Sequence, residues 1–137
     1  MKEIHLKFTD EEFREKFENF DLPSGTITHE AHFRIAWVYI KDYDFETALE
    51  KVNEGIKNYD NKHGDGTKYH ATITYAYMKI LESRAANQHY DDWQEFIFEN
   101  EDLLKPVDEV LLKYYNKETL FSDRAKSEFL EPDLAEF

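Results

Sequence analysis

The chain has 137 residues and no cysteine, and its 30 Asp and Glu residues against 17 Lys and Arg residues give it a formal net charge of −13. The length suits one domain with a substantial core, and an aromatic content of 16% counts against disorder although 34% of the residues are charged. The negative charge disfavours nucleic acids and anionic membranes as partners, and the lack of cysteine excludes disulfides, thiolate zinc sites and thiol nucleophiles.

The first residues, MKEIHLKFTDEEF, contain no apolar run of signal-peptide length, and no stretch of the chain is apolar enough to span a membrane. We therefore expect a cytoplasmic protein. Metal cations, small polar ligands and protein partners are all compatible with the acidic charge.

The first helix is predicted to begin after Thr9, because Thr9 and Glu12 have the spacing of a capping box. Phe13, Phe17 and Phe20 follow at spacings of four and three, so this helix should bury one aromatic stripe. The sequence DLPSG then ends it.

Two longer helices are predicted next. Thr28 is a suitable N-cap for the first, whose body FRIAWVYI is apolar almost all round, as is typical of a central, buried helix. The second begins near Asp44, and Gly64 is expected to end it in a left-handed C-terminal cap. Its apolar stripe consists of Phe45, Ala48, Leu49, Val52, Ile56 and Tyr59.

The second half of the chain is also predicted to be helical. A largely buried helix begins near Thr67, and Pro106 suits the first position of a later helix. KETLF and SDRAKSEFL are predicted as short terminal helices, with Ser122 as an N-cap and Pro132 ending the last. The predicted fold is all-α: a single-domain antiparallel helical bundle over residues 1–137, with short C-terminal helices.

Four histidines are predicted to meet at one end of this bundle. Short connections make neighbouring helices antiparallel, so the second and fourth helices should have their N-termini at the same end. His29 and His32 lie in the first turns of the second helix and His70 in the first turn of the fourth. The C-terminus of the third helix, with Tyr59 and His63, should reach that end too.

Three interpretations of this histidine cluster are open. His29, His32 and His70 could hold Zn²⁺, Fe²⁺ or Ni²⁺ and generate a metal-bound hydroxide for hydrolysis, although HEAH is one residue shorter than the metalloprotease motif. The two helix N-termini, with Thr28 and Thr74 near the histidines, could instead bind a carboxylate or phosphate. In the third interpretation the histidines satisfy polar groups at helix ends.

Several stretches resemble a family of small uncharacterised bacterial proteins: THEAH, YHATIT and the C-terminal elements LFS and PDL. The resemblance covers most of the chain from about residue 20. It implies a bacterial origin and no particular activity. The residues that it groups as one set are Thr28, His29, His32, His70, Thr74, Ser122 and Asp133.

A second stretch, AHFRIAWVYIKDYDFETALEKVNEGIKNY, is similar to one tetratricopeptide hairpin, but the following residues do not repeat the pattern. The leading functional prediction is a polar pocket, formed by His29, His32 and His70, that binds a divalent metal or a small anionic ligand. The alternative is a non-catalytic interaction module that uses an acidic helical surface. Whether the chain is an enzyme stays open.

Overall fold

The computed structural model describes residues 3–64, 69–87 and 90–137. Over these ranges the chain is helical and contains no strand, which confirms the predicted all-α fold. The chain divides into two compact units, Met1–Tyr69 and His70–Phe137. That the two units form a single domain stays a prediction.

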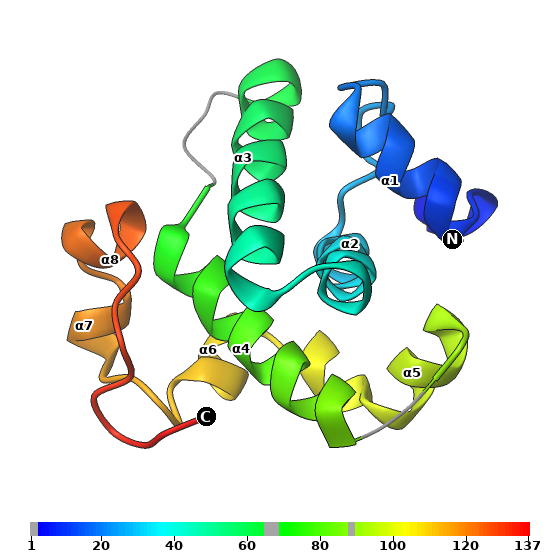
Figure 1. The fold of residues 1–137 in the computed structure, drawn as a ribbon. Helices are drawn as coiled ribbons and strands as arrows, with labels where there is room; N and C mark the ends of the chain where they lie inside the picture. Colours follow the sequence, from blue (N-terminus) through cyan, green and yellow to red (C-terminus); the bar gives the residue numbers. More distant parts are fainter. Residues whose placement is uncertain (1–2, 65–68, 88–89) are drawn as a thin grey trace. The chain divides into compact units, whose positions relative to one another are not determined.

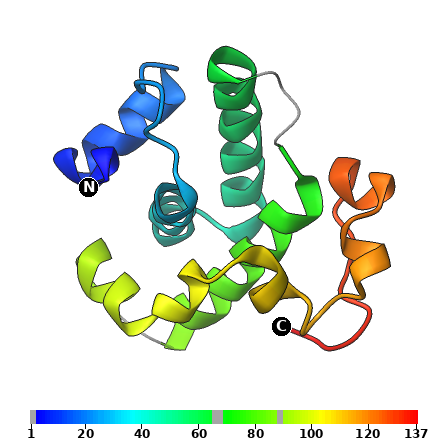
Figure 2. The ribbon, with the colours of Figure 1, turned by 180° about the vertical axis from the view of Figure 1, so that it is seen from behind.

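The N-terminal unit contains η1 (Ile4–Lys7), α1 (Asp10–Glu18), α2 (His29–Asp42) and α3 (Phe45–His63). In both ribbon views α2 is seen end-on while α3 is seen along its length, so these two helices cross (Figures 1 and 2). The middle of α2 is buried almost all round, as its apolar sequence predicts. Its buried residues are Ala31, Phe33, Arg34, Ile35, Ala36, Trp37, Val38 and Tyr39.

The N-caps predicted at Thr9 and Thr28 are confirmed, and Asp44, predicted only as the approximate start of a helix, is the N-cap of α3. A side-chain oxygen at each cap accepts a hydrogen bond from the amide three residues later, which satisfies one of the free donors of the first turn. The pairs are Thr9 with Glu12 at 3.1 Å, Thr28 with Ala31 at 3.2 Å and Asp44 with Thr47 at 2.7 Å. Glu12 also accepts from the Thr9 amide at 2.9 Å, which completes the capping box.

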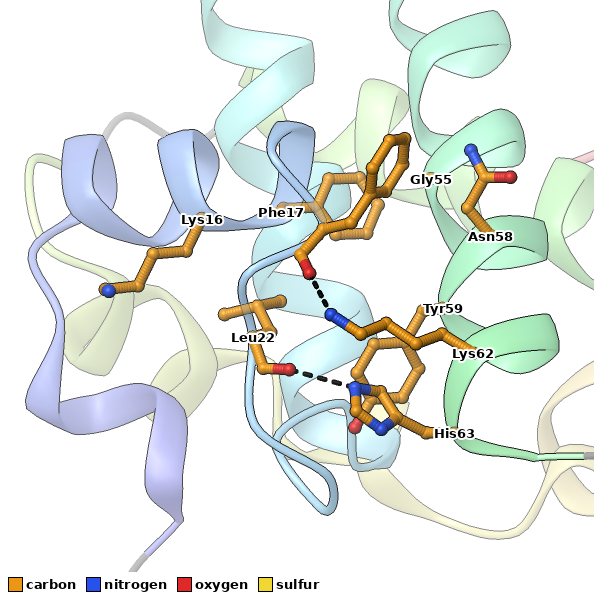
Figure 3. Close-up of a pocket in the computed structure, with 9 residues that line it drawn as sticks. Lys16, Phe17, Leu22, Gly55, Asn58, Tyr59, Lys62 and His63 are labelled. Atoms are coloured by element: carbon orange, nitrogen blue, oxygen red, sulfur yellow. Dashed lines mark hydrogen bonds between the residues drawn. The ribbon is translucent and has the colours of Figure 1, made fainter.

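Helix α1 approaches α3 closely at Gly55. A Cβ atom built on Gly55 would lie 2.1 Å from Cζ and 2.2 Å from Cε2 of the Phe17 ring. Both distances are far inside van der Waals contact, so the Phe17 ring occupies the space that any other residue at position 55 would need (Figure 3). Gly55 therefore determines how closely Phe17 packs on α3.

Two sequence predictions in this unit are wrong. Phe20 lies beyond the end of α1 and is 51% exposed, so it does not join Phe13 and Phe17 in the core. Gly64 does cap α3, but its φ of −126° and ψ of −156° are extended and not left-handed. The Gly64 amide donates to the Asp60 carbonyl at 2.8 Å, as in a regular helical turn, and the Asp60 side chain occupies the space beside Gly64.

The C-terminal unit contains α4 (Ala71–Asn87), α5 (Trp93–Glu99), η2 (Glu101–Leu104), α6 (Val107–Leu111), α7 (Lys117–Leu120) and α8 (Asp123–Ser127). In both views α7 and α8 lie near the start of α4, and α5 lies near its end (Figures 1 and 2). Ser122 is the N-cap of α8, as predicted, and accepts from the Ala125 amide at 3.1 Å.

Three boundaries in this unit differ from the predictions. The predicted start of the fourth helix at Thr67 falls outside the described residues, and α4 begins at Ala71. Pro106 is the N-cap of α6 and not its first residue. Helix α8 ends at Ser127, well before Pro132, because the chain then continues as an extended segment along α4.

The extended segment after α8 is fixed by side chains that bind its backbone. Thr72 donates to the Glu128 carbonyl at 2.5 Å and accepts from the Leu130 amide at 3.1 Å. The Tyr115 hydroxyl donates to the Leu130 carbonyl at 2.7 Å. These contacts give the segment the backbone partners that a helix would otherwise supply.

Candidate functional site

The histidines of α2 do not have the same surroundings. His29 is exposed, and its ring lies edge-on to Phe33 with the centroids 5.0 Å apart. His32 is half-buried, and burial lowers its pKa to about 4, with a smaller contribution from the nearby His29. His32 is therefore neutral at pH 7, as a metal ligand must be, but it is a poor binder of anions.

His70 uses both ring nitrogens in the fold. It precedes α4 and does not lie in its first turn, which corrects the prediction. Nδ1 accepts from the Ile73 amide at 3.1 Å, so the ring caps the helix, and Nε2 donates to the Leu120 carbonyl at 2.9 Å. Burial lowers the pKa of His70, which favours this neutral form. A metal at His70 would have to displace one of these bonds.

The threonines and the aspartate grouped with these histidines also have structural partners. Besides capping α2, the Thr28 hydroxyl donates to the Glu3 carboxylate. Thr74 is buried in α4, where its amide donates to the His70 carbonyl at 3.2 Å. Asp133 accepts from the Asn116 amide at 2.8 Å and from the Thr119 hydroxyl at 2.5 Å, at the start of α7.

No group of three or more His, Asp or Glu side chains within residues 3–64, 69–87 and 90–137 is arranged to hold a metal ion. The predicted metal set of His29, His32 and His70 therefore receives no support. His29 and His32 belong to the N-terminal unit and His70 belongs to the C-terminal unit, so their convergence stays a prediction.

His5 is a buried histidine to which sequence analysis assigns no role. Its side chain is fully buried, and Nε2 donates to the Glu30 carboxylate at 3.0 Å. Arg34 donates to Nδ1 at 3.2 Å and to the His5 carbonyl at 2.6 Å. Burial lowers the pKa of His5 against the opposing attraction of Glu30. One signal was visible in the sequence: Arg34 is a single cation inside an apolar run, and such a cation needs acceptors.

A small hollow lies between the end of α1 and the end of α3 (Figure 3). Lys62 donates to the Phe20 carbonyl and His63 donates to the Leu22 carbonyl at 3.0 Å, so both side chains hold the loop after α1. The Tyr59 hydroxyl accepts from the Thr26 amide at 3.1 Å in the same loop. The hollow has a volume of only 10 Å³, about enough for one water molecule, so it is a structural junction.

A larger hollow of 170 Å³ lies in the C-terminal unit and includes Arg84, Lys105 and Lys113. Arg84 forms a bidentate ion pair with Asp102, in which both N···O distances are 2.7 Å. It also donates to the Asn100 side-chain oxygen at 3.0 Å. Arg84, the cation of this hollow best suited to bind an anion, is therefore already bound to Asp102 and Asn100.

The remaining candidate site is an exposed face of α5, which we call the Phe98 face. It consists of Tyr90, Gln94, Glu95, Phe98 and Glu99, and these residues line a shallow hollow of 370 Å³. On the opposite side of α5 the Trp93, Phe96 and Ile97 side chains are buried.

Phe98 is the most exposed large apolar side chain of the described residues, at 71%. The segment from position 91 to position 102 contains six carboxylates and no lysine or arginine. The carboxylates are those of Asp91, Asp92, Glu95, Glu99, Glu101 and Asp102. Within the described part of the chain, neither Glu95 nor Glu99 forms a salt bridge with a lysine or arginine. Asp102 is paired with Arg84, whereas Glu95 and Glu99 lie on the face itself. The Phe98 face thus combines an apolar centre with carboxylates.

No helix of the described residues has the length and apolar character needed to cross a membrane. Comparisons of the chain with protein-family models, with curated proteins and with solved structures gave no match. The resemblances noted in the sequence therefore stay predictions, and the function has to be inferred from the chain's own residues.

Proposed function

We propose that this protein is a non-catalytic interaction module that binds a basic segment of a partner protein through the Phe98 face. The observation that carries the proposal is the 71% exposure of Phe98 within a segment of six carboxylates and no cation. An exposed phenyl ring contributes apolar contact area, and carboxylates around it favour a cationic partner.

The charge of the whole chain supports a basic partner. With a formal net charge of −13, the protein repels nucleic acid and anionic membranes and attracts cationic segments from a distance. Phenylalanine and tyrosine are enriched at the centres of protein interfaces, where they are surrounded by polar groups. The Phe98 face has this composition.

The histidines supply little support for the pocket hypothesis. His5, His63 and His70 each donate to a carboxylate or carbonyl within the fold. These bonds agree with the third sequence interpretation, in which histidines satisfy polar groups near helix ends.

The proposal can be tested with a synthetic peptide of about twelve residues that alternates lysine or arginine with leucine. We expect the wild-type protein to bind this peptide and not a matched peptide with glutamate in place of the cations. Binding should weaken as sodium chloride rises from 50 to 300 mM, because salt screens exposed charges. Isothermal calorimetry gives the dissociation constants.

A pair of double variants locates the binding surface. Glu95→Gln with Glu99→Gln should weaken binding about tenfold, since two interfacial charges are lost. The matched control is Glu50→Gln with Glu54→Gln, which removes two exposed carboxylates at the same spacing on α3 and should change binding less than about twofold. Equal losses in the two double variants, or equal binding of the acidic peptide, would overturn the proposal.

A further inference from the structure

The hollow of the Phe98 face contains the groups that recognise a flat organic cation. Tyr90 and Phe98 contribute aromatic rings, Glu95 and Glu99 contribute carboxylates, and Gln94 contributes an amide. Phe98 follows Glu95 by three positions, and Glu99 follows Glu95 by four. Residues at these spacings are neighbours on a helix surface, so the three side chains share one side of α5.

One wall of this hollow is held in place by the core. The Tyr90 ring packs edge-on against Phe96, with the ring centroids 5.7 Å apart and the planes at 70°. Phe96 is fully buried and in turn contacts Trp93, with a centroid distance of 5.7 Å. Tyr90 therefore needs little ordering on binding, which lowers the entropic cost of a contact with its ring.

We propose that the hollow binds the guanidinium group of an arginine in the basic segment of the partner. This inference rests on the proposed function and specifies its ligand. A guanidinium is planar, stacks on aromatic rings and presents five N–H donors that carboxylates can accept. A lysine ammonium matches the charge but cannot stack as a plane.

The chain uses the same combination within its own fold. The Arg34 guanidinium lies 5.2 Å from the centroid of the Phe13 ring and donates to the Asp10 carboxylate at 2.9 Å. Arg34 thus combines an aromatic face with a carboxylate, and the His5 and Phe8 carbonyls accept its remaining hydrogen bonds. The Phe98 face presents both groups to an arginine from outside.

Three peptides that differ at one central position test the inference. The position holds arginine, lysine or the neutral arginine isostere citrulline in an otherwise identical lysine- and leucine-containing sequence. We expect the wild-type protein to bind the arginine peptide roughly five- to tenfold more tightly than the lysine peptide, because stacking adds to charge attraction. The citrulline peptide should bind more weakly than the arginine peptide because it lacks the charge.

Two leucine variants test the role of the ring. Phe98→Leu keeps an apolar side chain but removes the more exposed of the two rings, so the ratio of arginine to lysine affinity should fall at least about twofold while the lysine peptide still binds. The control is Phe121→Leu, which changes a 50% exposed ring elsewhere in the same unit and should leave the ratio unchanged. Circular dichroism should show the same helical signal in both variants.

The outcomes separate the two proposals. If the wild-type protein binds the arginine and lysine peptides equally and the Glu95 and Glu99 variants still weaken both, the arginine inference is wrong and the proposed function stands. Retention of the ratio in Phe98→Leu would also overturn the inference. If none of the cationic peptides binds better than the acidic control peptide, the proposed function itself is wrong.

Discussion

Phe20 occupies a position at which many helices place glycine. The Asp21 amide donates to the Lys16 carbonyl at 2.8 Å and the Phe20 amide donates to the Phe17 carbonyl at 3.4 Å, which is the hydrogen-bond pattern of a Schellman cap. Phe20 has a φ of 57°, in the left-handed region that a residue with a Cβ atom adopts only at a cost in free energy. The loop after α1 therefore carries local backbone strain.

Replacing Phe20 with glycine should raise the free energy of unfolding by about 0.5–1 kcal/mol, because glycine adopts this conformation without the steric cost. Urea denaturation followed by circular dichroism measures the change. Gly25, with a φ of 84°, is the control, and Gly25→Ala should lower the free energy of unfolding by about 1 kcal/mol. A loss of stability in Phe20→Gly would mean that contacts of the phenyl ring outweigh the strain.

His32 should make the protein less stable in mild acid. Its pKa is about 4 in the folded protein and about 6.5 in an unfolded chain, so only the unfolded chain gains a proton readily between these values. The stabilisation due to neutral His32 is complete above about pH 6.5 and is lost as the pH falls toward 4.

Between pH 7 and pH 5 the wild-type protein should therefore lose about 1–2 kcal/mol more stability than His32→Gln, in which position 32 cannot titrate. Because the His32 ring is only half-buried, the expected loss of stability is smaller than the full pKa shift would give. Urea denaturation of both proteins at the two pH values measures the difference. Parallel pH curves for the two proteins would contradict the prediction.

At the scale of single residues, a role can be predicted from the sequence where the partner is local. The sequence predicts Thr9, Thr28 and Ser122 as N-caps because each partner amide lies three residues away. The bond from His70 to the Leu120 carbonyl spans fifty residues, and no periodicity in the sequence indicates it. His5 could not be placed for the same reason, because Glu30 lies twenty-five residues away.

At the scale of elements, one side chain attaches η1 to α2. Arg34 is buried in α2, and it donates to the carbonyls of His5 at 2.6 Å and Phe8 at 2.8 Å, at either end of η1. It also donates to Asp10, at the start of α1. Because a four-residue 3₁₀ helix has little stability of its own, its position depends on these bonds.

Arg34→Met should lower the free energy of unfolding by about 2–4 kcal/mol, since it leaves buried acceptors without a donor while keeping most of the apolar stem. Amide exchange of Phe8, which donates to the His5 carbonyl at 3.1 Å, should accelerate more than exchange within α3. The control is Arg14→Met, which breaks the exposed pair of Arg14 with Asp42 and should cost less than about 1 kcal/mol. Equal costs in the two variants would contradict this role of Arg34.

Helices with a continuous apolar stripe could be predicted from the sequence, and their ends only in part. The apolar stripe in the sequence predicts α3, and the structure confirms it: Ala48, Leu49, Val52 and Ile56 of the stripe are all buried. The sequence predicts that Pro132 ends the last helix, but the chain after Ser127 bonds to Thr72 and Tyr115 and leaves the helix earlier. Such long-range competition for backbone partners leaves no local signal.

At the scale of the whole molecule, the net charge of −13 should oppose compaction by self-repulsion. At pH 7 we expect the midpoint of thermal unfolding to rise by roughly 2–5 °C when sodium chloride increases from 10 to 300 mM, because salt screens this repulsion. Differential scanning calorimetry measures the midpoint. The rise should disappear near pH 4.8, the isoelectric point of the sequence, and a falling midpoint at pH 7 would contradict the prediction.

The fold class followed from the sequence because few glycines and prolines interrupt its helical patterns. The candidate site did not follow, because its key property is exposure. In the sequence FIFE, Phe96 and Phe98 look equivalent, yet Phe96 is fully buried and Phe98 is 71% exposed. Only the orientation of the seven-residue helix α5 on its unit distinguishes them.

The contact between Phe17 and Gly55 has a consequence for the divergence of this chain. Because the phenyl ring fills the space of a Cβ atom at position 55, a mutation that enlarges Gly55 should survive selection mainly after position 17 has become smaller. Homologous sequences should therefore show correlated change at these two positions, thirty-eight residues apart. A lineage with leucine or alanine at position 17 could then replace Gly55 with a larger residue. In its ancestry, the substitution at position 17 should precede the substitution at position 55.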